Sequence, residues 1–322
     1  MSTESLVEAG LLPLALLPRT EQLARAHARA ADALARGRLD VGVAPIVASP
    51  RETGARARLK LRADARGRLG FHRVGSHDWM QVPLDALARP EIVAEAARIE
   101  AWGGARDEVE LRSDGVTVTT VLSASPARPV ADLGEANVAQ GARTLAGRPT
   151  LRVGGLRVSP LSFYQVNLEI NEAIVARVEA ELVRLAPARL LDLYAGIGNL
   201  SARSVARGVS ATLVEVDKHS SGDARVNCPG AEILVQDAAK LKAGERFFDV
   251  ALLDPPRAGA PGVIPRLLVT RPRAVIYLSC EPTTLARDLG PLAAAGYRFT
   301  TAQPYEMFPG TDHVETLVVA ER

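Results

Sequence analysis

The sequence predicts an α/β protein in two parts, in which a smaller α+β region precedes a larger domain built on a mainly parallel sheet. Its 322 residues, 47% hydrophobic and 24% charged, suffice for one large or two ordinary globular domains. From residue 167 onward, helical stretches alternate with short apolar runs. That alternation is typical of a parallel sheet with helices on both faces. Residues 55–63 instead alternate between basic and apolar side chains, which predicts a half-buried strand in the first region.

The first 150 residues contain one clear helix and several short strands. Glu21–Arg36 has an apolar face, with Thr20 as N-cap and Gly37 as the stop. Strands are expected at 41–47 and at 115–123, and an inter-domain loop is expected at 125–149. We therefore divide the chain into a helical segment (1–40), a central α+β domain (41–150) and a C-terminal domain (151–322).

Basic side chains collect on a predicted hairpin of the central domain. The strand at 55–63 carries four of them on one face: Arg56, Arg58, Lys60 and Arg62. A turn and a second strand at 68–74 complete the hairpin. Residues 51–73 include eight basic and two acidic residues. Either this is an ordinary solvated surface, or it follows the phosphate backbone of a nucleic acid. The net charge of +2 does not decide between them.

Several classes of protein are excluded. Two cysteines, Cys228 and Cys280, are too few for a disulfide framework or a four-cysteine metal cluster. The longest apolar stretch, residues 11–17, is interrupted by Pro13 and followed by Pro18, and no basic leader precedes it. We therefore expect neither a signal peptide nor a membrane span, and a cytoplasmic location.

The C-terminal domain is expected to hold five parallel strands and a closing antiparallel edge. The five strands are predicted at 189–194, 210–216, 232–235, 248–253 and 274–279. The edge is predicted at 297–301 and 313–320, with no helix between its two strands. In such sheets, ligands gather at the carboxyl ends of the strands.

A glycine turn follows the first of these strands. Gly196 and Gly198 let a ligand approach the backbone before a helix begins at about Asn199. This pattern suits a dinucleotide as well as S-adenosylmethionine. Glu215 ends the next strand, where a carboxylate can accept hydrogen bonds from ribose hydroxyls, and Asp237 follows the third strand, where it could border an adenine. Both acids could equally be ordinary loop caps.

The most specific signal is a set of ordered motifs from about residue 160 to the end. Besides the glycine turn, they are Ser162-Phe-Tyr-Gln-Val-Asn167, Leu252-Leu-Asp-Pro-Pro-Arg-Ala-Gly259, Tyr277-Leu-Ser-Cys-Glu-Pro-Thr-Thr-Leu-Ala-Arg-Asp288 and Met307-Phe-Pro-Gly-Thr-Asp-His-Val-Glu315. This set closely resembles the RNA uracil-C5 methyltransferase family. The resemblance implies a Rossmann-like class I S-adenosylmethionine-dependent methyltransferase domain preceded by a smaller α+β domain. It also implies structured RNA (rRNA or tRNA) as the partner, and we expect a monomer.

The resemblance assigns the chemistry to two residues. Uracil C5 is a poor nucleophile, so a thiolate must first add to C6 and a base must later remove the C5 proton. By motif matching, Cys280 is the nucleophile and Glu315 the base, and Cys228 has no role. Cofactor contacts are expected from Gln165, Tyr194, Gly196, Gly198, Asn199, Glu215, Asp237 and Asp254. Arg257 and Phe308 are expected to bind substrate. Phe163 and Tyr164 are candidate stacking surfaces, with plain core packing equally open.

The chain also departs from the family pattern. Many members carry an N-terminal β-barrel RNA-binding domain and cysteines that hold an iron–sulfur centre, and neither feature is found here. With no cysteine before residue 228, we expect no iron–sulfur cluster and no other metal site. Glu281 stands where asparagine is common, and its carboxylate is expected to raise the pKa of the neighbouring thiol.

Two other functions stay open at this point. The first is a methyltransferase that acts on a small molecule or an amino group, since amino-group methyltransferases share the Asp-Pro-Pro run. The second is a non-catalytic RNA-binding descendant, such as a folding chaperone. Loss of Cys280 would leave activity intact in the first case and RNA binding intact in the second.

Overall fold

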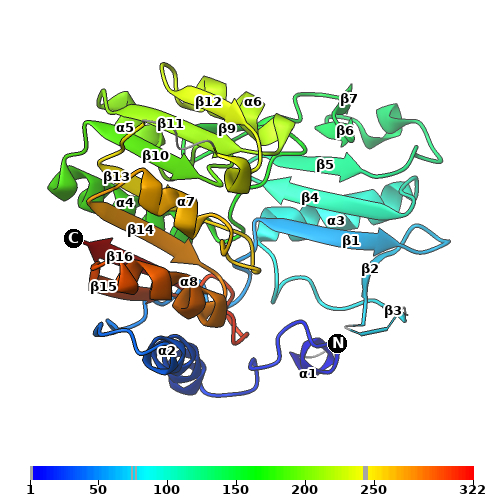
Figure 1. The fold of residues 1–322 in the computed structure, drawn as a ribbon. Helices are drawn as coiled ribbons and strands as arrows, with labels where there is room; N and C mark the ends of the chain where they lie inside the picture. Colours follow the sequence, from blue (N-terminus) through cyan, green and yellow to red (C-terminus); the bar gives the residue numbers. More distant parts are fainter. Residues whose placement is uncertain (1–2, 74, 77, 242–245) are drawn as a thin grey trace.

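The computed structural model describes residues 3–73, 75–76, 78–241 and 246–322. Its C-terminal half is built on a seven-stranded sheet with strand order β12-β11-β10-β13-β14-β16-β15 (Figure 1). The strands are β10 (Arg189–Leu193), β11 (Ser210–Glu215), β12 (Glu232–Val235), β13 (Val250–Leu253), β14 (Ala274–Ser279), β15 (Arg298–Tyr305) and β16 (Glu315–Glu321). All seven predicted strands of this domain are present, and the predicted α/β class is confirmed.

The pairing directions agree with the prediction. Strands β10 to β14 pair in parallel, whereas β16 runs antiparallel to both β14 and β15. The closing edge is therefore antiparallel, as expected, although both of its strands differ in extent from the predicted runs. The antiparallel partner brings the start of β16 beside the carboxyl end of β14.

Helices cover both faces of this sheet. One face packs against α4 (Leu168–Leu185), α5 (Ala202–Ala206) and α6 (Lys218–Asn227). The other face packs against α7 (Ile264–Val269), α8 (Pro282–Ala294) and α2 (Arg19–Arg36). Figure 1 shows α2 beside α8 at the lower edge of the domain. Two separate apolar clusters result, as expected for a sheet buried on both faces.

The central region has a sheet of its own, with strand order β3-β2-β1-β4-β5-β6-β7. Its strands are β1 (Arg58–Ala63), β2 (Leu69–His72), β3 (Trp79–Met80), β4 (Glu108–Ser113), β5 (Val118–Leu122), β6 (Val138–Gln140) and β7 (Arg143–Ala146). One helix, α3 (Pro90–Trp102), packs on it. The predicted β1–β2 hairpin is confirmed, except for residue 74, which lies outside the described residues.

Two predictions for this region are wrong. Residues 125–149 are not a plain loop, because they contain β6, β7 and a short 3-10 helix at Val130–Leu133. Residues 41–47 form no continuous strand and make isolated parallel bridges to the outer edge of β15 at Val43 and Val47. Pro45 lacks the N–H that a continuous ladder would need there.

Within the predicted helical segment 1–40, no separate element was predicted before α2. It contains α1 (Thr3–Glu8), which lies near β3 (Figure 1). Leu6 and Leu12 are buried in a cluster with Val82 and Leu87 of the central region. Helix α2 starts at Arg19, without the expected Thr20 cap. The segment therefore runs across the molecule from the central sheet to the C-terminal domain.

Buried polar groups join the two halves behind the β8–β9 hairpin (Leu151–Val153 and Leu156–Val158). The Tyr164 hydroxyl lies 2.9 Å from the carbonyl oxygens of Ala57 and Ser113 and accepts a hydrogen bond from the Ser113 N–H. Arg112 is fully buried and donates to the carbonyls of Pro160 and Ser162. Tyr164 is therefore core packing rather than a stacking surface.

The described residues contain neither a helix that could span a membrane nor a cluster of metal-binding side chains. None of the described helices is both long and apolar enough to cross a membrane. The described histidine, cysteine, aspartate and glutamate side chains form no group of three or more that could hold a metal ion.

Candidate active site

The predicted site residues lie where the parallel strands end. Tyr194, Asp237, Asp254 and Cys280 come one or two residues after β10, β12, β13 and β14, and Glu215 is the last residue of β11. Carboxyl ends of parallel strands share one edge of a sheet. The fold therefore brings residues from the ends of five strands to a single rim.

The glycine turn after β10 is held open by its backbone. Gly196 and Gly198 both have positive φ, and so does Tyr194 (62°). The Gly196 N–H donates to Glu215 Oε2 at 2.9 Å, and the Asp217 N–H donates to Oε1 at 2.7 Å. A Cβ added to Gly196 would meet no atom within 4 Å. The turn thus leaves open space beside a fixed carboxylate whose remaining lone pairs can accept further hydrogen bonds.

Cys228 packs behind this turn. It ends α6, is 1% exposed, and would lie only 2.4 Å from a Cβ placed on Gly198. Burial and the nearby Asp192 raise the pKa of Cys228 to about 12. Asp192 is itself buried, and its Oδ2 has no hydrogen-bond partner among the described residues. Position 198 must therefore be glycine for reasons of space as well as conformation.

The remaining predicted cofactor residues surround the same rim. Asn199 and Asn171 of α4 exchange two amide hydrogen bonds, at 2.8 and 3.1 Å. Asp237 is exposed and caps a short 3-10 helix through the Ala239 N–H. Burial raises the pKa of Asp254, while a hydrogen bond from Gln165 lowers it. An open glycine turn with an acid after each neighbouring strand suits a ribose and an adenine, so the residues present fit S-adenosylmethionine.

Cys280 and Glu315 meet through the antiparallel edge. The β14–β16 ladder ends with the pair Ser279 and Thr316; Cys280 directly follows Ser279 and Glu315 directly precedes Thr316, so both lie at the same end of this ladder. Glu315 is 4% exposed, and its Oε2 has no hydrogen-bond partner among the described residues. The predicted nucleophile and base, 35 residues apart in sequence, are therefore close together at this end of the ladder.

The charged groups around Cys280 and Glu315 shift the pKa values of these two residues in opposite directions. Burial, Glu315 and Asp254 raise the pKa of the Cys280 thiol to about 11, whereas Arg257 lowers it. Burial and Asp254 raise the pKa of Glu315, and Arg257 again lowers it. A carboxyl with a raised pKa is a stronger base than an exposed one. The positive charge of Arg257 favours the charged forms of both groups.

A cavity of about 240 Å³ lies next to this site. Its lining residues are Gly10, Leu11, Pro13, Arg56, Arg257, Phe308, Thr311, Asp312 and His313. The Arg56 guanidinium lies over the Phe308 ring, 5.8 Å from its centroid, and the His313 ring meets Phe308 edge-on at 5.9 Å. Arg257 lines this cavity and also lowers the pKa of Cys280, so the cavity lies on the Arg257 side of the site.

Glu281 behaves differently from the expectation. Its carboxylate caps α8 through the Thr283 N–H at 3.2 Å and pairs with Arg29 of α2 at 2.7 Å. Arg29 also pairs with Asp312 at 3.2 Å. The carboxylates that raise the pKa of Cys280 are Glu315 and Asp254. The expected effect of Glu281 is therefore corrected, because a cation 252 residues away in sequence neutralises it.

The basic strand β1 carries ion pairs along its outer face. Lys60 pairs with Glu108 at 3.2 Å, and Arg62 pairs with Asp107 and Glu108 of the neighbouring chain segment. Arg58 lies 3.7 Å from Glu110 and over the ring of Phe163, 4.5 Å from its centroid. Arg56 precedes β1 and points to the cavity instead. RNA binding by all four residues stays a prediction. Arg56 differs from the other three in its position, because it lies before β1 and lines the cavity.

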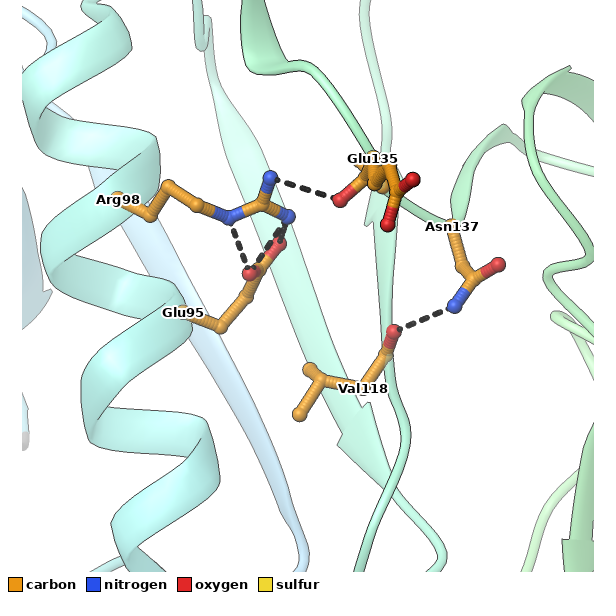
Figure 2. A pocket seen from close by; sticks show the side chains of 6 residues that line it. Glu95, Arg98, Val118, Glu135 and Asn137 are labelled. Carbon is orange, nitrogen blue, oxygen red and sulfur yellow. Dashed lines mark hydrogen bonds and ion pairs between the residues drawn. The ribbon is translucent and has the colours of Figure 1, made fainter.

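A second hollow, of about 320 Å³, lies on the central region beside α3 (Figure 2). Arg98 pairs there with Glu95 and donates to the carbonyl of Glu135, and Asn137 donates to the carbonyl of Val118. Every polar group that Figure 2 joins by a dashed line is bonded to another protein group. This hollow lies on the central sheet, away from the strand ends that carry the predicted site residues.

Comparisons with known proteins found a matching family model and similar curated proteins. The family model described as tRNA (Uracil-5-)-methyltransferase matches residues 238–322. The 23S rRNA (uracil(1939)-C(5))-methyltransferase RlmD of Salmonella choleraesuis (strain SC-B67) is 33% identical over 301 residues, covering 83% of this chain and 70% of the relative. RlmD of Klebsiella pneumoniae (strain 342) is 39% identical over 180 residues, covering 52% and 41%.

One solved structure shares the fold across both halves. It is the tRNA (uracil-54, C5)-methyltransferase of Pyrococcus abyssi in complex with S-adenosyl-L-homocysteine. It superposes with a TM-score of 0.76, covers 95% of this chain and 84% of its own, and is 22% identical in sequence. The likeness therefore extends over the central region as well as the C-terminal domain.

Proposed function

Because the chain belongs to the RNA uracil-C5 methyltransferase family, we propose that it methylates C5 of a uridine in ribosomal or transfer RNA through a covalent Cys280 adduct that Glu315 resolves. One observation carries the proposal beyond family membership. The β14–β16 register makes Cys280 and Glu315 neighbours, and Glu315 keeps a buried oxygen without a partner among the described residues. A nucleophile beside a buried, unpaired base is the arrangement that this chemistry needs.

The methyl donor would lie at the rim of the parallel strands. Glu215 would accept hydrogen bonds from the ribose, and the Gly196–Gly198 turn would admit the rest of the molecule without collision. When bound there, S-adenosylmethionine supplies an electrophilic sulfonium methyl group. Asp254, which accepts a hydrogen bond from Gln165, lies at this rim close enough to Cys280 to raise the pKa of its thiol, and the two side chains would orient the uracil or the donor.

The covalent step begins at the sulfur. Cys280 Sγ would form a bond to uracil C6, the C5–C6 π pair would become a C4–C5 double bond, and the C4–O π pair would move onto the oxygen, so that C5 is the nucleophilic carbon of an enolate. The thiol must first lose its proton, although its pKa is raised to about 11 in the free protein. Arg257 assists this step, because its charge lowers the pKa of the thiol.

Glu315 would complete the reaction after C5 has taken the methyl group, whose bond to the sulfonium sulfur breaks to leave S-adenosylhomocysteine. The Glu315 carboxylate would take the C5 proton, the electron pair would restore the C5–C6 double bond, and the C6–S bond would break to release Cys280. Burial and Asp254 raise the pKa of Glu315, which strengthens it as a base. This sequence of steps consumes no oxidant or reductant, and we propose that it needs no iron–sulfur cluster.

The test uses RNA in which 5-fluorouridine replaces uridine. After methyl transfer C5 then carries fluorine in place of the proton, so Glu315 has nothing to remove and the adduct persists. The protein is incubated with S-adenosylmethionine and fluorinated transcripts of tRNA or of ribosomal RNA fragments. We expect a denaturation-resistant protein–RNA band that maps to Cys280 by mass spectrometry and is absent from Cys280→Ser.

Two outcomes would contradict the proposal. Methylation of either RNA by Cys280→Ser at the wild-type rate would exclude the covalent route. RNA binding without methylation or adduct, on total RNA that lacks the modification, would instead indicate a non-catalytic RNA-binding protein.

A further inference from the structure

The cavity beside the active site contains two cations that lack acidic partners. Within the parts of the chain that the structure describes, neither Arg56 nor Arg257 has a carboxylate oxygen within 4.0 Å, whereas Lys60 and Arg62 on the same hairpin do. Asp312 also lines the cavity, but Arg29 pairs with it. Burial lowers the pKa of Arg56, so this group loses solvation that no ion pair replaces. The cavity therefore offers strong donors to an anion.

The segment 10–13 forms the facing wall of this cavity. Gly10, Leu11 and Pro13 line it. The Leu14 N–H donates to the Gly310 carbonyl at 2.9 Å, which ties the segment to the turn that carries Phe308 and His313. Leu12 is buried in the cluster with Val82 and Leu87. The wall is therefore anchored on both sides, to the central region and to the catalytic turn.

We propose that this cavity binds a phosphodiester group of the RNA next to the target uridine, between the guanidinium groups of Arg56 and Arg257 and the wall at 10–13. The inference rests on the proposed function. Guanidinium groups present planar, always-charged donor forks that match phosphate oxygens. A volume of about 240 Å³ lies below the range of about 300–1,000 Å³ typical of drug-sized ligands, which favours one phosphate group over a whole dinucleotide.

Position links the cavity to catalysis. Arg257 is close enough to Cys280 to lower the pKa of its thiol, and it also lines the cavity. A phosphate held there would lie one group away from the reacting base. The segment 10–13 closes one side of the cavity. It would therefore restrict binding to RNA whose backbone can enter between this segment and Phe308.

The wall is tested with a matched pair of substitutions. Leu11→Glu places a carboxylate opposite the two guanidinium groups, where it competes with phosphate. Leu16→Glu adds the same charge to the same segment at a side chain that is 60% exposed and outside the cavity lining. We expect Leu11→Glu to raise KM for RNA about 10-fold, with kcat and S-adenosylmethionine affinity unchanged, and Leu16→Glu to keep wild-type KM.

The cation is tested by Arg56→Gln, with Arg207→Gln as the control. Arg207 is exposed and paired with Glu179 on the catalytic domain. For Arg56→Gln we expect KM to rise about 10-fold and the slope of log Kd against log salt to fall by about 0.7, as for one lost contact to single-stranded nucleic acid. Arg207→Gln should change neither value.

The inference is overturned if Leu11→Glu keeps the wild-type KM, or if Arg56→Gln weakens binding without changing the salt slope. Failure of the proposed function is recognised separately, because the wild type would then form no fluorouridine adduct. In that case the affinities of Leu11→Glu and Leu16→Glu for the same RNAs, measured by fluorescence anisotropy, still test whether the cavity binds RNA phosphate. Equal affinities would exclude it, and a weaker Leu11→Glu complex would support it.

Discussion

The two cysteines occupy neighbouring regions of one domain and have different surroundings. Cys280 follows β14 at the rim of the sheet, is partly exposed, and lies among Arg257, Asp254 and Glu315. Cys228 ends α6 beneath the glycine turn and is 1% exposed. Burial raises the thiol pKa of both, to about 11 and about 12.

This comparison shows that thiol pKa alone does not identify the nucleophile. Both thiols are protonated at neutral pH in the free protein, so the distinguishing features are access and neighbours. Cys280 has a cation that lowers its pKa and an open cavity beside it. Cys228 has a buried aspartate that raises its pKa and a glycine packed against its sulfur. The first arrangement can react with a substrate, and the second can only pack.

The largest difference is expected between substitutions of the two sulfurs. Cys280→Ser removes the atom that forms the covalent bond, so kcat for RNA methylation should fall on the order of 10⁴-fold or more. Cys228→Ala should keep kcat within about 3-fold. Methyl incorporation from labelled S-adenosylmethionine into RNA measures both. Equal losses would remove the distinction between the two sites.

Substitution of Glu315, the proposed base, tests which step of the reaction this residue performs. Glu315→Gln should lower the methylation rate by about 10²- to 10⁴-fold, because the C5 proton is no longer removed. The adduct should then accumulate on ordinary uridine-containing RNA, with Cys280 as the attached residue. Denaturing gels with radiolabelled RNA detect it. A slow variant without any adduct would assign Glu315 to an earlier step.

Thermal stability serves as a control for this variant. The pKa of Glu315 is raised in the folded protein, so the wild type loses stability as the pH rises through that folded pKa. Glu315→Gln carries no such charge and should keep its stability there. A variant that unfolds more easily than wild type at alkaline pH would point to a structural role.

Alkylation rates test the charges around the reactive thiol. Because Arg257 lowers and Glu315 raises the pKa of Cys280, Arg257→Gln should slow its reaction with iodoacetamide and Glu315→Gln should accelerate it, each about 10-fold per unit of pKa. The wild-type rate should climb with pH toward about 11. Mass spectrometry separates the two cysteines, and Cys228 should stay unlabelled in native protein. Changes of the same sign in both variants would refute this assignment.

The smallest effect is expected from the packing cysteine. Cys228→Ala removes one buried sulfur, which should cost about 1 kcal/mol and lower the melting temperature by about 2–4 °C. Affinity for S-adenosylmethionine should change little, since the turn keeps its own hydrogen bonds to Glu215. Calorimetry and donor titration measure these quantities. A large loss of donor affinity would show that Cys228 helps to shape the turn.

The sequence by itself determined the class of the fold, the succession of the C-terminal strands along the chain and the motif residues on which the proposed chemistry rests. Each of these is local: apolar runs of strand length mark the parallel sheet, and motifs such as Leu278-Ser-Cys-Glu281 stand directly at strand ends. The central sheet was less readable, because short edge strands such as β6 and β7 carry weak patterns and depend on pairing with distant partners.

Only the tertiary structure decided which charges act on one another. Glu281 has its partner Arg29 in a helix near the other end of the chain, and the basic side chains of β1 are paired across the sheet with β4. The Leu14 N–H ties the segment 10–13 to the turn that carries Phe308 and His313, and the buried Leu12 ties it to the central region. Coulombic interactions depend on distance in space and on burial, and neither quantity can be read from sequence separation. For that reason the chain's near-neutral composition concealed a cavity with two unpaired cations beside Cys280.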